Sequence, residues 1–524
     1  MKILKTILIC FIITAGHAQH GVGLLHLGDN IIQSNQLNAA LIPYEGTFFL
    51  GLPGISNLSL GYNNRFDYAT TFTPNPETGN PRIDTKSIGD NLKKNNYLSF
   101  KGSISTLFLG FRANPQSMTT YIFANEVADL HWSYAQDEFN FLLNGNEPGS
   151  KYDFEKLKFH ARWYREIGLG ISVPLSSYRM SVGARIKRLY GILDASLHPK
   201  YNAQVNTSVD NYQIDFFYEN AIFRTSGVQD ILDNNFDNRP TSMANGGWGA
   251  DLGLHWRMND FYSLSAAVNN LGYIRWKEGN TIYAVTNAEL DYTGADLSND
   301  SVNFEQIVQD SLLNLFETSE TQEAYTTWLH PNMNLSGTVH LDKDNEIKAT
   351  FITHFIYGKF RNVYGLGYLR KVGRWLRVNV NAVKTPQNFL DLGGAVSMTT
   401  GFLQFHLAVD QTLDYRNMTR FKQADVSFGI NFIFGRPKPP KKQKEEDSPY
   451  NDPDWLEHPS RPTPPTVVTE KDGKIYSLIK KLAPPEKWEK WVTGKNKEEK
   501  HKNSVKEAQY YKKKRYKYKA PKTK

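Results

Sequence analysis

Apolar and polar side chains alternate along short stretches that recur through most of the chain. In residues 424–434, ADVSFGINFIF, every second residue from Val426 to Phe434 is apolar, and small or polar residues occupy the other face. This alternation, ending on an aromatic residue, is typical of the last strand of an outer-membrane β-barrel. Each stretch is about ten residues long, the length that a tilted strand needs to cross a bilayer core. The pattern predicts an all-β fold, a transmembrane antiparallel β-barrel of about 14 to 16 strands.

The connections between the predicted strands test this topology. Counted back from the last strand, the earlier strands are expected at about 402–411, 388–398, 375–384, 362–371, 346–356, 333–341, 261–273, 247–257, 208–220, 191–203, 178–188, 162–173, 118–127 and 104–113. Periplasmic turns of single-chain barrels are short, and the compact, turn-rich connections all fall on one side: 371–374, 342–345, 258–260, 174–178 and 114–117. The long connections all fall on the opposite, outer side: about 128–161, 221–246 and 274–332.

The N-terminus predicts export across the inner membrane. Lys2 and Lys5 precede an apolar run, and small residues up to Ala18 suit a cleavage site, so residues 1–18 are expected to be a signal peptide. The single cysteine, Cys10, lies within this peptide. The mature chain would therefore contain neither a disulfide nor a thiolate metal site. No later stretch is apolar for long enough to form a transmembrane helix.

The segments on either side of the barrel differ from it. Residues 19–95 alternate like strands only in part, so they are expected to be either an internal hatch or the first strands. The barrel is expected over 96–434. Residues 435–524 hold 25 Lys and Arg against 13 Asp and Glu, and 12 of the 24 prolines. They predict a disordered basic tail in the periplasm, outside the barrel.

Strand geometry also predicts which polar side chains face the lumen, because apolar neighbours must face lipid. The candidates are Glu166, Arg185, Lys187, Asp251, His255, Arg377, Asn379, Asp391, Gln404, His406 and Asp410. They carry both charge signs, and two interpretations remain open. They line a path that steers polar or amphiphilic solutes, or they form a salt-bridged network that fills the lumen or holds a plug.

Motifs for catalysis are missing from the sequence. It contains no GxSxG, HExxH, Walker loop or GxGxxG, and its histidines are scattered singly, without metal-ligand spacing. We therefore expect no enzyme, no metal and no cofactor. Histidines such as His255 and His406 are expected to be structural, although barrel hydrolases that pair a wall histidine with a wall serine keep an enzyme as a third hypothesis.

The tail contains two candidate binding elements. One is a short amphipathic stretch, which would form against a partner: Ile475, Leu478, Ile479, Leu482, Trp488 and Trp491. The other places cations between tyrosines: Lys512, Lys513, Lys514 and Arg515. In the periplasm these suit a cell-wall polymer, anionic lipid or an acidic protein, and no nucleic acid is expected. The alternative is a solvated end without a partner.

Several segments together resemble a family of uncharacterised outer-membrane barrels from Bacteroidota. The matching pieces are NQLNAALIPYEGTFFLGLPGIS, YREIGLGISV, MSVGARIKRLYGIL, GGWGADLGLHWR, LSAAVNNLGYIRW and the ending VSFGINFIFG. That family is similar to fatty-acid-transporter-like barrels and to barrels of type IX secretion and gliding systems. Its members usually carry Asn-Pro-Ala where this chain has Asn38, Ala39 and Ala40. The resemblance implies a cell outer membrane location and contact with its lipid, and it supplies no catalytic residues.

Two main functions are therefore expected from the sequence. The first is a conduit or binding site for small hydrophobic or amphiphilic solutes. The alternative is an envelope scaffold or anchor, associated with secretion or motility, whose basic tail binds a periplasmic protein or cell-wall polymer.

Overall fold

The computed structural model describes residues 21–435, with internal gaps at 44, 65, 67–70, 75–80, 84, 115–116, 139–140, 142–147, 176–178, 199, 211–213, 234–235, 293–318, 387–389 and 411–421. The chain divides into two units, residues 1–438 and 439–524. The predicted signal peptide, and the tail beyond residue 435 with all its candidate binding residues, lie outside the described residues.

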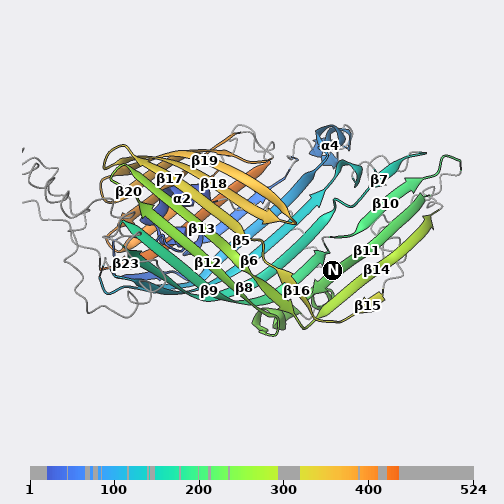
Figure 1. Cartoon of the computed structure of the whole chain (residues 1–524), viewed down its shortest axis with the longest axis horizontal. Helices are drawn as coiled ribbons and strands as arrows, with labels where there is room; N and C mark the ends of the chain where they lie inside the picture. Colours follow the sequence, from blue (N-terminus) through green and yellow to red (C-terminus); the bar gives the residue numbers. More distant parts are fainter. Residues whose placement is uncertain are drawn as a thin grey trace, which may run out of the picture. The chain divides into compact units, whose positions relative to one another are not determined.

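The described strands form a closed antiparallel barrel of 14 strands, which confirms the predicted fold class (Figure 1). β1 and β2 follow one another as the first barrel strand, and Phe48 of β1 pairs with both Phe434 and Phe111, which closes the barrel. In chain order the strands are β1 (Phe48–Gly51) with β2 (Leu58–Asn63), β5 (Asn96–Phe111), β6 (Thr119–Tyr134), β8 (Lys158–Leu175), β9 (Met180–Leu197), β12 (Gly246–Arg257), β13 (Tyr262–Trp276), β17 (Asn332–His340), β18 (Asn345–Ile356), β19 (Lys359–Val372), β20 (Leu376–Lys384), β21 (Asp391–Thr400), β22 (Leu403–Val409) and β23 (Gln423–Phe434).

Two of the predicted barrel strands are wrong. β9 continues without a break to Leu197, so residues 191–203 are not a separate barrel strand. Residues 208–220 overlap β11 (Ile214–Ser226), which belongs to an extension of the sheet. Because both errors lie in the same connection, the alternation of short and long connections is unaffected.

The extension continues the sheet from the end of β9 (Figure 1). There β11 pairs with β9 over Phe223–Ser226 and with β14 (Asn280–Tyr292) along its length. Short strands complete it: β7 (Lys151–Asp153), β10 (Asn202–Thr207) and β15 (Ser319–Thr321). Another short strand, β16 (Tyr325–Trp328), pairs with the end of β13.

The N-terminal segment contains both of the elements that the sequence offered as alternatives. Residues 48–63 supply the first barrel strand, whereas α2 (Val22–Leu27), η1 (Gly28–Asn30) and η2 (Ile32–Gln36) pack against the inner face of the wall. Val22, Leu25 and Leu41 join one buried cluster with wall residues Ile352, Val363 and Val383. Leu24, Leu27 and Ile31 join a second one with Leu369, Ala395 and Ala408. We refer to residues 21–42 as the hatch.

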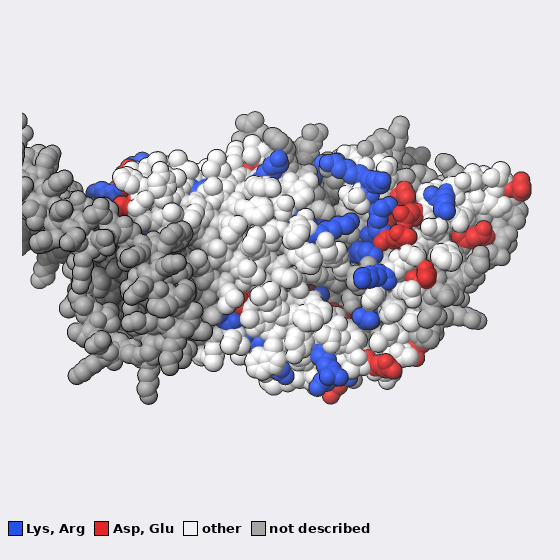
Figure 2. Space-filling view, in the orientation of Figure 1, with Lys and Arg blue, Asp and Glu red and all other residues white. Residues whose placement is uncertain are grey.

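Side chains on the outer wall are apolar. On β8, Ile167 and Leu169 are 41% and 66% exposed, while the alternating Glu166 is buried. Other strands repeat this with exposed Ile186, Leu252, Leu366, Val380 and Leu392. Figure 2 shows few charged side chains in the middle of the view, while Lys, Arg, Asp and Glu gather at the right, where Figure 1 draws the extension. Among the described helices, none has both the length and the apolar character to cross a membrane.

Candidate functional site

The hatch touches the wall closely where two strands carry glycine. A Cβ on Gly183 of β9 would lie 2.2 Å from the backbone of Ala39, and one on Gly253 of β12 would lie 2.1 Å from Oδ1 of Asn38. Asn38 donates through Nδ2 to Oγ of Ser265, at 2.7 Å, and its Oδ1 accepts from the Ala40 amide at 2.9 Å. These two glycines therefore make room for the Asn38 turn of the hatch.

Carboxylates of the wall hold the start of the hatch. Asp410 accepts the backbone N–H groups of Val22 at 2.6 Å and Gly23 at 2.5 Å, while Asp425 accepts that of Gly21 at 3.1 Å. A carboxylate that accepts N–H groups at the first turn of a helix stabilises it, because the helix presents unpaired donors there. The hatch is thus fixed at both its first turn and its Asn38 turn.

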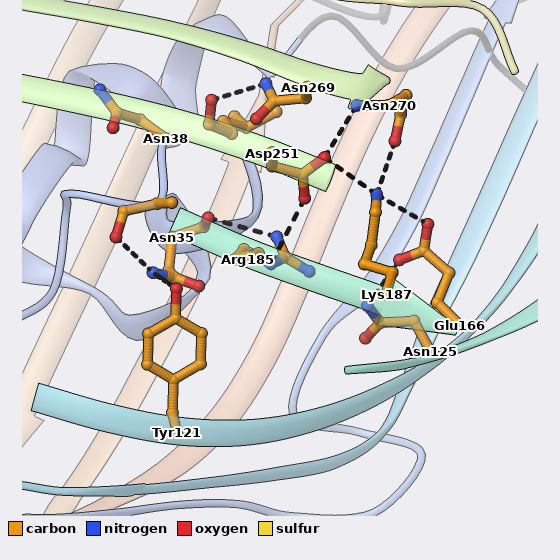
Figure 3. Close-up of polar contacts among 12 residues, drawn as sticks. Asn35, Asn38, Tyr121, Asn125, Glu166, Arg185, Lys187, Asp251, Asn269 and Asn270 are labelled. Carbon is orange, nitrogen blue, oxygen red and sulfur yellow. Dashed lines mark hydrogen bonds and ion pairs between the residues drawn. The ribbon is translucent and has the colours of Figure 1, made fainter. Parts of the chain in front are cut away.

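Four of the predicted lumen residues come together in one network (Figure 3). Lys187 Nζ lies 3.1 Å from Glu166 Oε1 and 3.0 Å from Asp251 Oδ1, and it donates to Asn270 Oδ1 at 2.9 Å. Arg185 Nε lies 3.5 Å from Asp251 Oδ2. All four charged side chains are at most 6% exposed. This cluster is the Lys187 network.

The Lys187 network also reaches the hatch. Arg185 donates to the backbone oxygen of Asn35 at 3.3 Å, and Asn35 donates to the Tyr121 hydroxyl at 2.9 Å. The Arg185 guanidinium lies 3.9 Å from the centre of the Phe123 ring. These contacts join the charged residues of the wall to the hatch.

The other predicted lumen residues are spread over the wall. Gln404 donates to the Asn30 backbone at 2.8 Å, and Arg377 donates to the Asn30 side chain at 3.2 Å, so both contact the hatch. Asn379 donates to the Tyr368 backbone at 3.1 Å. His406 is buried, with Nε2 3.4 Å from Ser427 Oγ, whereas His255 and Asp391 are half-buried. The structure does not bring Asp391 or His255 into the Lys187 network.

A partly open cavity is lined by residues of several barrel strands, and the space of about 760 Å³ around it includes open solvent. Its apolar lining includes Tyr97, Tyr164, Leu329, Ile356 and Val363. Two lining residues connect it to the features above, because Asn270 is bonded to Lys187 and Val363 packs in a cluster with the hatch. The cavity therefore lies next to residues that contact the hatch and the Lys187 network.

A polar cluster on the cavity wall was missed from the sequence. Asp129, His131 and His160 line the cavity together with His330 and Arg361. β6 and β8 pair His131 with His160 and Asp129 with Arg162. The spacing of two between Asp129 and His131 was a usable signal, because it places both on one face of a strand. His330 comes from a distant part of the chain, and no spacing could have revealed it.

Together these features define a closed antiparallel barrel with a hatch made from its own N-terminal segment. A family model described as "Family of unknown function (DUF5723)" matches residues 40–410, and the chain belongs to this family. No curated protein matches the chain. The predicted origin in Bacteroidota and the link to type IX secretion stay predictions.

Solved structures of several channels are similar to the chain at low identity. The CymD monoaromatic hydrocarbon channel is 10% identical with a TM-score of 0.37, over 80% of this chain and 98% of that one. A Pseudomonas aeruginosa FadL homologue is 10% identical with a TM-score of 0.33, over 75% and 91%. Outer membrane phospholipase A from Escherichia coli is 11% identical with a TM-score of 0.19, over 78% and 98%. At these TM-scores the likenesses carry no argument about function.

Proposed function

We propose that the protein is an outer-membrane barrel that acts as a conduit or binding site for small hydrophobic or amphiphilic solutes. The observation that carries this proposal is the cavity. The cavity is partly open to solvent rather than enclosed. Aromatic and aliphatic side chains share its lining with polar and charged ones, including Lys101, Asp129 and Arg361. Such a lining suits a solute with an apolar body.

The hatch controls passage in this proposal. The cavity lies next to the hatch and the Lys187 network, because its lining includes Val363, which packs against the hatch, and Asn270, which is bonded to Lys187. Passage then requires the hatch to shift from the wall, which breaks the bonds from Asp410, Asn38 and Arg185. The exposed apolar residues of the wall support placement in a lipid bilayer.

Photo-crosslinking tests the proposal. The full chain in detergent is exposed to an alkyl amphiphile that carries a diazirine, and labelled peptides are mapped by mass spectrometry. We expect labels on cavity residues such as Leu329 and Ile356, and we expect Ser99→Trp, which fills the cavity, to abolish them. Ile104→Trp is the matched control, because Ile104 lies on the same strand and is 40% exposed on the outer wall. Equal cavity labelling in both variants would contradict the proposal.

A second candidate function is an envelope scaffold. The bonds that fasten the hatch favour it, because a barrel that keeps its lumen closed serves as an anchor. Deleting residues 436–524 would then remove a periplasmic partner in pull-down experiments and leave solute labelling unchanged. If the deletion removed no partner and left solute labelling unchanged, the scaffold function would be excluded.

A further inference from the structure

Three potential metal ligands meet on the cavity wall. Asp129 of β6, His160 of β8 and His330, which lies between β16 and β17, each offer one ligand atom, and these atoms lie within 4.8 Å of one another. All three residues line the cavity. We call these three residues the histidine cluster.

The distances between the ligand atoms of the histidine cluster suit a tetrahedral metal better than direct hydrogen bonds. His160 Nε2 lies 3.5 Å from Asp129 Oδ2, and His330 Nδ1 lies 4.0 Å from the same oxygen. Nitrogen and oxygen ligands about 2.0–2.2 Å from zinc are about 3.4 Å apart at the tetrahedral angle. Hydrogen bonds are shorter, about 2.7–3.2 Å. The three atoms therefore already stand close to the spacing that a shared cation requires.

Buried polar atoms near the cluster have no partner within the described part of the chain. These atoms include Asp129 Oδ1 and His131 Nδ1. The ring of His131, which is 2% exposed, lies 5.8 Å from that of His160. Native proteins rarely leave such atoms unpaired, so their presence beside the cluster indicates a missing partner.

The second nitrogen of His160 is already positioned. His160 Nδ1 lies 2.9 Å from the Tyr357 hydroxyl. A hydrogen bond to the other ring nitrogen orients most metal-binding histidines and fixes their tautomer. This contact leaves Nε2, the nitrogen that faces Asp129, available as a ligand.

The neighbouring cation has its own counterion. Arg162 Nε lies 3.4 Å from Asp194 Oδ1, and Arg162 also donates to the Trp328 backbone at 3.1 Å. Asp194 is fully buried. Lys101, the cross-strand neighbour of Asp129 on β5, also lines the cavity and is a second cation with which a metal ion would compete for Asp129.

We propose that Asp129, His160 and His330 bind a divalent transition metal of the zinc class. Two imidazoles and one carboxylate select such a metal over Mg²⁺ or Ca²⁺, which prefer oxygen ligands throughout. Three protein ligands leave a fourth position, which would face the cavity that these residues line. The inference is independent of the solute that the barrel carries.

Metal titration of the full chain tests this site. The protein is purified in detergent without a polyhistidine tag, treated with a chelator and titrated with Zn²⁺ by calorimetry. Co²⁺ is used in parallel, because its visible absorption reports tetrahedral coordination. We expect one saturable site, and at least about a 10-fold loss of affinity in Asp129→Asn, His160→Gln and His330→Gln. Tyr357→Phe, which keeps all three ligands, is expected to weaken binding by about 10-fold.

The control variant is His255→Gln, because His255 is a half-buried histidine of β12 that does not belong to the cluster. It should bind Zn²⁺ like the unaltered chain. Gel mobility without boiling checks that each variant is a folded barrel. The absence of a saturable Zn²⁺ site in the unaltered chain would overturn the proposal, and so would unchanged affinity in folded His160→Gln/His330→Gln.

Discussion

The Lys187 network and the histidine cluster share strand β8, but the charged side chains of the network are buried, whereas Asp129 and His330 of the cluster are each 19% exposed. In the network, Lys187 meets Glu166 and Asp251 at 3.0–3.1 Å. In the cluster, Asp129 stands 3.5–4.0 Å from two histidines, and its second oxygen has no partner among the described residues. Buried polar groups cost free energy unless they are paired. The comparison therefore separates a network whose shared cation is closely paired from a cluster whose three ligand atoms stand further apart.

The largest expected effect is the loss of stability when the shared cation of the network, Lys187, is removed. Lys187→Met leaves the buried carboxylates of Glu166 and Asp251 without their shared cation. Breaking a buried ion pair in this way lowers the free energy of unfolding by about 3–5 kcal/mol. Thermal unfolding in detergent measures the loss. The control is Lys156→Met, which removes the exposed pair with Asp153 and should cost about 0–1 kcal/mol. Equal losses in the two variants would remove the distinction.

Asp410→Asn tests the first turn of the hatch. It exchanges a carboxylate for an amide beside the N–H groups of Val22 and Gly23. Hydrogen bonds to a charged group contribute about 1.5–3 kcal/mol. We expect faster amide hydrogen exchange in residues 21–42 while the barrel strands keep their protection. Unchanged exchange in the hatch would show that Asp410 does not hold it.

Gly253→Val tests the close contact at the Asn38 turn. The added side chain would overlap Asn38 Oδ1 and push the hatch from the wall, at a cost of about 1–3 kcal/mol. Planar-bilayer recordings should then show larger conductance than for the unaltered chain. Gly337→Val is the matched control, because the nearest atom to its Cβ, on Leu264, lies 3.8 Å away. A similar rise in conductance in the control would contradict this role of Gly253.

The most local expected effect concerns a buried carboxylate in a connection outside the barrel strands. Burial raises the pKa of Glu138 from 4.5 to about 7, and its Oε2 accepts the Ala135 N–H. Because the folded-state pKa is higher, the stabilisation is full below about pH 4.5 and is lost as pH rises through 7.

The measurement is unfolding of this connection, followed by hydrogen exchange from pH 5 to pH 8. Glu138→Gln should remove this pH dependence, because glutamine does not titrate. An equal pH dependence in the variant would contradict the assignment to Glu138.

The sequence predicted most of the barrel because lipid requires a strict alternation on each strand. Strands such as β12 and β23 lie within a residue or two of their predicted bounds. The break predicted just before Gly191 was wrong for a physical reason. Gly191 lies within β9, where a Cβ would be 2.4 Å from the Trp276 ring. This glycine makes room for a side chain, and strand periodicity cannot distinguish that role from a turn.

The site was less predictable than the wall. Alternation predicted that side chains such as Lys187 face the lumen, and Lys187 is buried in the structure. It could not show which of these side chains meet, because that depends on register between strands. The histidine cluster also needs His330, which lies far from β6 and β8 in the sequence. Only the closure of the barrel brings it next to them. The candidate partner residues of the tail lie outside the described residues, and their roles stay predictions.

Locating a bromine-labelled alkyl amphiphile in a crystal of the full chain is the most direct test of a solute site in the lumen. The account predicts anomalous bromine density in the cavity beside Tyr97 and Val363, and its loss in Ser99→Trp. Bromine density confined to the outer wall, with none in the cavity, would contradict it.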